Sequence, residues 1–160
     1  MGVPGVCCDT VLGQPTPPFV PGPEALTEHL SLDPVPASVS TARKFVREVL
    51  GPVDEDLRDT VLLLSSELVT NAILHAHTPV QLGMVVDHAY VLVCVADRMP
   101  GVTLEAGDHS RDRPGGRGLA LVADLSAQWG TVPVTGGKTV WFTVPIALTA
   151  ASTTTAVRAG

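Results

Sequence analysis

The sequence predicts an α+β fold in which helices cover one face of a mixed, mainly antiparallel sheet. Two stretches with apolar residues at helical spacing precede two short apolar runs joined by a turn, which is typical of a β-hairpin. A glycine-rich junction then opens a third helical stretch, and a second pair of strand-like runs follows. This order of elements indicates a two-layer α/β sandwich.

The first strand is expected at 28–33, "EHLSLD", at an edge of the sheet. A helix follows in "PASVSTARKFVREVLG", where apolar residues recur at helical spacing, and Gly51 and Pro52 end it. The second helix runs from about Asp54 to Ala76, with Pro79 marking its end. Its predicted buried positions are Leu57, Val61, Leu64, Leu68 and Ala72.

"VQLGMVVD" and "AYVLVCVAD" predict two strands joined by a turn at Asp87 and His88. The polar, breaker-rich stretch "RMPGVTLEAGDHSRDRPGG" predicts a loop. The helix that starts at "GGRGLALVADL" has Leu119, Val122 and Leu125 in its apolar register. "QWGTVPV" and "KTVWFTVPI" close the domain as a further hairpin.

Composition limits the classes of partner. The chain has 160 residues, of which 45% are apolar and 16% charged, as in a soluble globular protein. Its net charge of −6 argues against binding to nucleic acid or to an anionic membrane surface. No apolar segment reaches membrane-spanning length, and no signal peptide is visible. We therefore expect a cytoplasmic protein with no nucleic-acid or membrane partner.

Proline and glycine divide the chain into three parts. Residues 1–23 predict a flexible leader, 24–148 the folded domain and 149–160 a flexible tail. The cysteines show no CxxC motif and no paired spacing of metal ligands. Cys94 is expected to be a small buried apolar residue, and a reducing compartment is the simplest expectation.

Three groups of polar residues carry candidate chemistry. Glu67 and Asn71 are four residues apart, so their side chains lie together on the second helix, and His75 continues the line. A carboxylate and a carboxamide so placed suit a hard cation and a proton acceptor. Taken alone, this pattern also fits the wet edge of an amphipathic helix, and His75 equally fits a local hydrogen bond.

The second and third groups lie near strand and helix ends. Asp97 ends an apolar strand, where a carboxylate can accept a hydrogen bond from an exocyclic amine or simply start a turn. Gly116 and Gly118 in "GGRGL" open a helix whose free N–H groups attract phosphate. The dinucleotide-binding and Walker-type patterns are absent from this sequence.

In order, "ELVTNA", "D…G", a polar loop, "GRGL" and "GKTVWF" resemble the GHKL ATPase/kinase superfamily over residues 33–145. The likeness is to its anti-sigma-factor serine/threonine kinases and the short actinobacterial ATP-binding regulators. This resemblance implies a Bergerat-type sandwich that binds ATP and Mg²⁺. It also implies Glu67 as the general base and Asn71 as the Mg²⁺ ligand.

The resemblance further implies that Asp97 recognises the adenine amine through a water shared with Thr139. Phosphates would bind the backbone amides of Gly116, Arg117 and Gly118. Further implied parts are an ATP lid over 102–114, with Arg111, Arg113 or Arg117 offsetting phosphate charge, and the first glycine box at Gly101. Met99 departs from that box because it occupies its first glycine position.

The leading hypothesis is an anti-sigma-type protein serine/threonine kinase that binds a sigma factor and phosphorylates a small antagonist protein. A second hypothesis is a non-enzymatic module that binds such a regulator with or without nucleotide, and Met99 motivates it. A simple ATPase is the third. The resemblance is also compatible with a homodimer.

Overall fold

The structure is a computed structural model and describes residues 6–99 and 116–146. One sheet of five strands organises these residues, with strand order β1-β2-β3-β5-β4. The elements in chain order are α1 (Val6–Leu12), β1 (Leu26–Leu32), α2 (Ser38–Leu50), α3 (Glu55–Ala76), β2 (Val80–Val86), β3 (Tyr90–Asp97), α4 (Gly116–Leu125), β4 (Gln128–Val134) and β5 (Gly137–Pro145). The predicted α+β class and the predicted edge position of β1 are confirmed.

Every neighbouring pair of strands in this sheet is antiparallel, so the predicted mixed sheet is corrected to a purely antiparallel one. The physical reason for the antiparallel order lies in the chain segments that connect the strands. Short turns join β2 to β3 and β4 to β5, and such turns produce antiparallel neighbours. The return through α2–α3 places β2 antiparallel to β1, and the return through α4 leaves room for β5 between β3 and β4, antiparallel to both.

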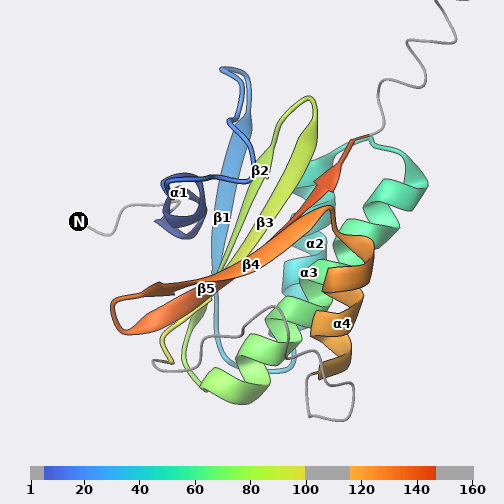
Figure 1. The fold of residues 1–160 in the computed structure, drawn as a ribbon. Coiled ribbons are helices and arrows are strands. Elements are labelled where there is room, and N and C mark those ends of the chain that lie inside the picture. Colours follow the sequence, from blue (N-terminus) through green and yellow to red (C-terminus); the bar gives the residue numbers. More distant parts are fainter. Residues whose placement is uncertain (1–5, 100–115, 147–160) are drawn as a thin grey trace, which may run out of the picture.

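Helices α2, α3 and α4 form a layer on one face of the sheet, as Figure 1 shows. The main core lies between this layer and the sheet. All five predicted core positions of α3 are buried. Leu125 differs from its predicted place because it is the last residue of α4 and is exposed, whereas Leu119 and Val122 are buried.

The opposite face of the sheet is covered by α1, which corrects the predictions of a flexible leader and of helices on one face only (Figure 1). Cys7, Cys8 and Val11 are buried there against Val85, Leu92 and Cys94 of the sheet. Burial of this apolar side holds the helix in place although prolines follow it.

The chain between α1 and β1 is also attached to the sheet. The Gly22 N–H donates to Oδ2 of Asp87, at 2.7 Å, in the turn between β2 and β3. The rings of Phe19 and Tyr90 lie 5.3 Å apart. The predicted tail at 149–160 lies outside the described residues, and among those described no helix is long and apolar enough to cross a membrane.

Candidate functional site

Helix α3 positions Glu67 and Asn71. Its N-cap is Asp54, whose side chain accepts the N–H of Leu57 at 3.2 Å, and its C-cap is His77 in the left-handed conformation. Its apolar side packs on the sheet, and both Glu67 and Asn71 are half-buried beside that side. His75, one turn later, is exposed. The two polar side chains therefore lie at the margin of the core.

Helix α4 brings Gly118 directly against this pair. A Cβ atom at Gly118 would lie 2.8 Å from Oε2 of Glu67 and 3.1 Å from Nδ2 of Asn71. The first of these distances is too short for a Cβ atom, so a side chain at position 118 would displace the carboxylate of Glu67 from the start of α4. Residues some 50 positions apart in the sequence thus meet where the resemblance places nucleotide.

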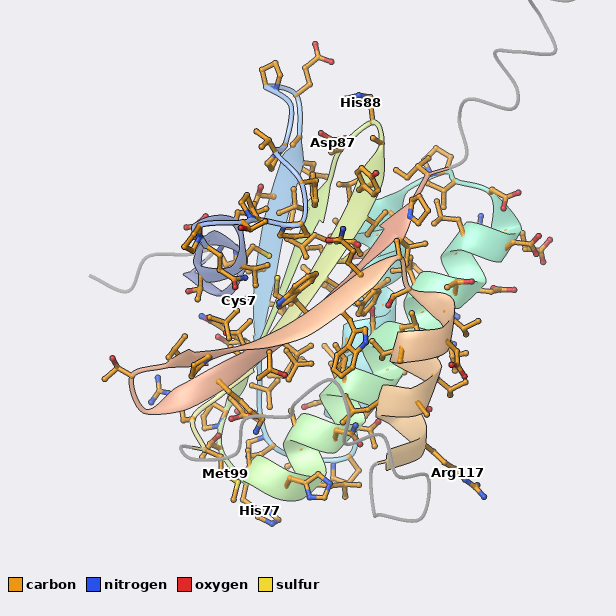
Figure 2. The ribbon with its side chains drawn as sticks, viewed as in Figure 1. Cys7, His77, Asp87, His88, Met99 and Arg117 are labelled. Carbon is orange, nitrogen blue, oxygen red and sulfur yellow. The ribbon has the colours of Figure 1, made fainter. Side chains whose placement is uncertain are left out.

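The first turn of α4 also supplies backbone donors. Gly116 begins the helix, and Arg117 and Gly118 follow, so their N–H groups fall in the turn that makes no intrahelical bonds of its own. Such a turn carries a partial positive charge that favours anions. Arg117 itself is exposed and points away from the body of the protein (Figure 2).

Asp97 lies at the end of β3 and is buried with only 7% of its surface exposed. Its Oδ1 accepts the N–H of Met99 at 2.9 Å, and its Oδ2 lies 2.9 Å from Nζ of Lys138. The side chain of Lys138 is only 13% exposed, so this ion pair is largely withdrawn from water. Sequence reasoning overlooked Lys138.

A second glycine makes this ion pair possible. A Cβ atom at Gly137 would lie 2.0 Å from the carbonyl oxygen of Asp97, so the start of β5 approaches the end of β3 only with glycine there. Lys138 then pairs with Asp97 in the strand register. The alternation of Lys138, Val140 and Phe142 in "GKTVWF" is the signal that could have identified the lysine.

Thr139 does not lie beside the Asp97 side chain. The prediction that the two residues share a water is corrected for this reason. Thr139 is paired with Ala96, one position before Asp97. Successive side chains of a strand point to opposite faces, so Thr139 faces α1 with Trp141, whereas Asp97 faces the helix layer. Lys138 takes the place beside Asp97.

The predicted first glycine box and lid are only partly described. Gly101 and the segment 102–114, with Arg111 and Arg113, lie outside the described residues. Met99 is 38% exposed. The N–H of Arg98 donates to Oγ1 of Thr78 at 3.2 Å, which ties the chain after β3 to the end of α3. In Figure 2, Met99 and His77 mark this end of the molecule.

Comparison with known proteins gives a family and a fold for this chain. A family model for the histidine kinase-like ATPase domain matches residues 32–144. Among solved structures, the crystal structure of the RsbU and RsbW domains of Rv1364c from Mycobacterium tuberculosis is similar, with a TM-score of 0.60 and 21% identity. The match covers 76% of this chain and 32% of that one, so this chain spans about a third of its length. No curated protein matches the chain.

The structural likeness shows the fold alone, because the identity is low. The family model adds the sequence, since it extends from the last residue of β1 to the end of β5 and includes Glu67, Asn71, Asp97 and Gly118. Such a domain implies nucleotide binding. The chain belongs to the histidine kinase-like ATPase domain family.

Proposed function

We propose that this chain is an ATP-binding regulatory protein of the anti-sigma kinase type, which phosphorylates a serine or threonine of a small antagonist protein. The observation that carries the proposal is the contact of Gly118 with Glu67 and Asn71. It joins a proton acceptor, a carboxamide group and a helix start within one site. Membership of an ATPase domain family supports nucleotide as the ligand.

The residues present fit Mg-ATP. Half-buried oxygen donors suit a hard cation, and Gly118 lets the start of α4 lie directly against them. When bound, Mg-ATP supplies the phosphoryl group and the metal offsets phosphate charge. Asn71 would hold the metal through its amide oxygen, and the first-turn amides of Gly116 to Gly118 would bind phosphate oxygens.

Glu67 would accept the proton of the attacking hydroxyl. Its carboxylate is held on a rigid helix and is partly withdrawn from water, two conditions that favour positioned proton transfer. Asp97 would accept a hydrogen bond from the adenine amine, and its existing bonds to Met99 and Lys138 fix its orientation. A sigma factor and its antagonist are the proposed partners, in line with the RsbW domain of the structural relative.

The test is phosphoryl transfer from Mg-[γ-³²P]ATP to the antagonist candidate encoded next to this gene. We expect Glu67→Gln to reduce the rate by about 10²- to 10⁴-fold, as for loss of a general base, while Mg-ATP still binds. Glu55→Gln is the matched control because it makes the same change at an exposed position of the same helix. Transfer by Glu67→Gln at the wild-type rate would contradict the kinase proposal.

The second candidate is a non-enzymatic binding module, favoured by the Asp97–Lys138 ion pair and by Met99 in the glycine box. Both features reduce the capacity of Asp97 to accept a hydrogen bond from the adenine base. Calorimetry with Mg-ATP separates the candidates. Partner binding without any nucleotide binding favours a pure module, and nucleotide-dependent partner binding without transfer favours a nucleotide-gated switch. Phosphate release without a partner instead indicates a simple ATPase.

A further inference from the structure

Three cysteines meet on the face of the sheet that α1 covers. Cys7 and Cys8 come from α1 and Cys94 from the middle of β3, and their Sγ atoms all lie within 4.8 Å of one another. All three are free thiols and nearly inaccessible, with exposures of 2%, 1% and 0%. Figure 2 shows Cys7 on α1 beside the sheet, on the side away from α3. We call this group the three-cysteine cluster.

Gly83 of β2 makes room for the three-cysteine cluster. It is paired with Cys94 in the sheet, so both positions face α1. A Cβ atom at Gly83 would lie 2.5 Å from Sγ of Cys7 and 2.7 Å from Sγ of Cys8. Two sulfur atoms therefore converge on the spot where any other residue would place its side chain. Ordinary apolar packing of small residues does not require this arrangement.

His29 extends the same row of the sheet. It is paired with Gly83 from the other side, on β1, so its side chain also faces α1. Among the described residues, its Nδ1 atom is buried and has no hydrogen-bond partner. An imidazole nitrogen without a partner thus lies on the α1 side of the sheet, two strands from Cys94 and outside the group of sulfur atoms that lie within 4.8 Å of one another.

The donor set indicates one class of ligand. Thiolates are soft ligands that select Zn²⁺ and Cu⁺ over hard cations, and three cysteines with one histidine form a common structural zinc site. A disulfide would use two of the sulfur atoms and leave the third buried beside it. Three sulfur atoms within 4.8 Å of one another fit a single bound ion better than they fit one disulfide.

We propose that Cys7, Cys8 and Cys94 bind one thiophilic d¹⁰ metal ion, Zn²⁺ or Cu⁺, and that His29 is the fourth ligand when the ion is Zn²⁺. Binding would release the three thiol protons and fasten α1 to the sheet. This inference is independent of the proposed kinase function, because the two sites use opposite faces of the sheet.

The experiment uses the full reduced chain, freed of metal, and titrates it with Zn²⁺ against a chromophoric chelator. We expect one ion per chain, and with Co²⁺ a thiolate-to-metal charge-transfer band. Cys94→Ser should weaken binding by roughly 100-fold or more, since even loss of an outer-shell contact to a metal ligand costs about 10- to 100-fold. Val11→Ala is the matched control, because Val11 is equally buried on the sheet-facing side of α1 but offers no ligand atom.

A parallel titration with Cu⁺ identifies the ion. Zinc binding weakened at least about tenfold by His29→Ala, with Cu⁺ binding unchanged, supports the four-ligand zinc site. Tight Cu⁺ binding that His29→Ala leaves unchanged, together with weak zinc binding, supports the three-thiolate copper site. Metal binding that survives replacement of all three cysteines overturns the proposal. So does an equal loss in Val11→Ala and Cys94→Ser, or a buried disulfide that forms in air despite added Zn²⁺.

Discussion

The two faces of the sheet differ in how far apart in the sequence their polar groups lie. On the helix face, Glu67 and Asn71 are one helical turn apart, and the glycines of α4 form one short motif. On the α1 face, Cys7 and Cys94 are 87 positions apart. A local pattern can be recognised before folding, whereas the three-cysteine cluster exists only once α1 has docked.

Strand β3 belongs to both faces. Val93, Val95 and Asp97 point toward the helix layer, and Cys94 and Ala96 point toward α1. Asp97, which we propose to contact nucleotide, and Cys94 therefore share a rigid strand, but their side chains lie on its opposite faces. We expect a substitution on one face to leave the function of the other unchanged, and the following predictions test that separation.

The largest expected effect is at the ion pair between Asp97 and Lys138. Lys138→Met leaves a carboxylate buried without its counter-charge and should lower the free energy of unfolding by about 3 kcal/mol or more. Urea denaturation measures this loss. The control is Lys44→Met, which removes an exposed i,i+4 pair with Glu48 at 4.0 Å and should cost less than about 0.5 kcal/mol.

A double variant sharpens that result. Asp97→Asn together with Lys138→Met removes both charges and should recover part of the lost stability, because no unpaired buried charge is left. If Lys138→Met were as stable as the wild type, burial of the Asp97 carboxylate would not depend on the charge of the lysine. The thiols on the α1 face should stay protected from Ellman's reagent in both variants.

The next effect is on the α1 face. Gly83→Ala places a methyl group against the sulfur atoms of Cys7 and Cys8 and should destabilise the protein by about 1–3 kcal/mol through overpacking. The measurements are urea denaturation and thiol accessibility. Adding Cys7→Ala to this variant should restore part of the stability. A fall in nucleotide affinity in Gly83→Ala would contradict the separation of the two faces.

The matching change on the helix face is Gly118→Ala. Alanine is a better helix former than glycine by about 1 kcal/mol, and the carboxylate of Glu67 can rotate away, so the fold should keep its stability. Displacement of Glu67 and Asn71 should nevertheless weaken binding of Mg-ATP by roughly tenfold or more, since positioning governs such sites. Calorimetry gives the affinity, and unaltered thiol protection is the control.

The smallest expected effect is at Asp87. Hydrogen bonds from the N–H groups of Gly22 and Ala89 lower the pKa of this carboxyl below its usual value. A lowered folded-state pKa stabilises the protein above the unfolded pKa of about 3.9 and ceases to do so as pH falls through the folded value. Asp87→Asn should therefore cost about 1–2 kcal/mol at pH 7, partly screened by solvent.

The difference between wild type and Asp87→Asn should shrink as the pH falls below about 4. Unfolding by urea at pH 7, 5 and 3 measures it. His88→Ala is the control, because His88 lies 3.2 Å from Asp87 but its side chain is 82% exposed. A difference that stays constant at acid pH would show that Asp87 does not hold the leader through its charge.

Much of the helix face was predictable because its signals are periodic or local. The apolar spacing of α3 gave its five core positions, and the four-residue step placed Glu67 beside Asn71. The face of the sheet to which Thr139 points could not be predicted. A shift of one residue in the strand register moves every side chain to the opposite face. The pairing of Asp97 with Lys138 becomes visible only in the register of β3 and β5.

The sequence by itself determined the α+β class, the elements from β1 to β5 and the motifs of an ATPase domain, since these depend on periodicity and on short spacings along the chain. Only the tertiary structure decided that α1 covers the second face of the sheet and that Cys7, Cys8 and Cys94 meet at Gly83. Long-range burial overrides local breaker signals, and no pattern along the chain records which distant residues a sheet will bring to one face.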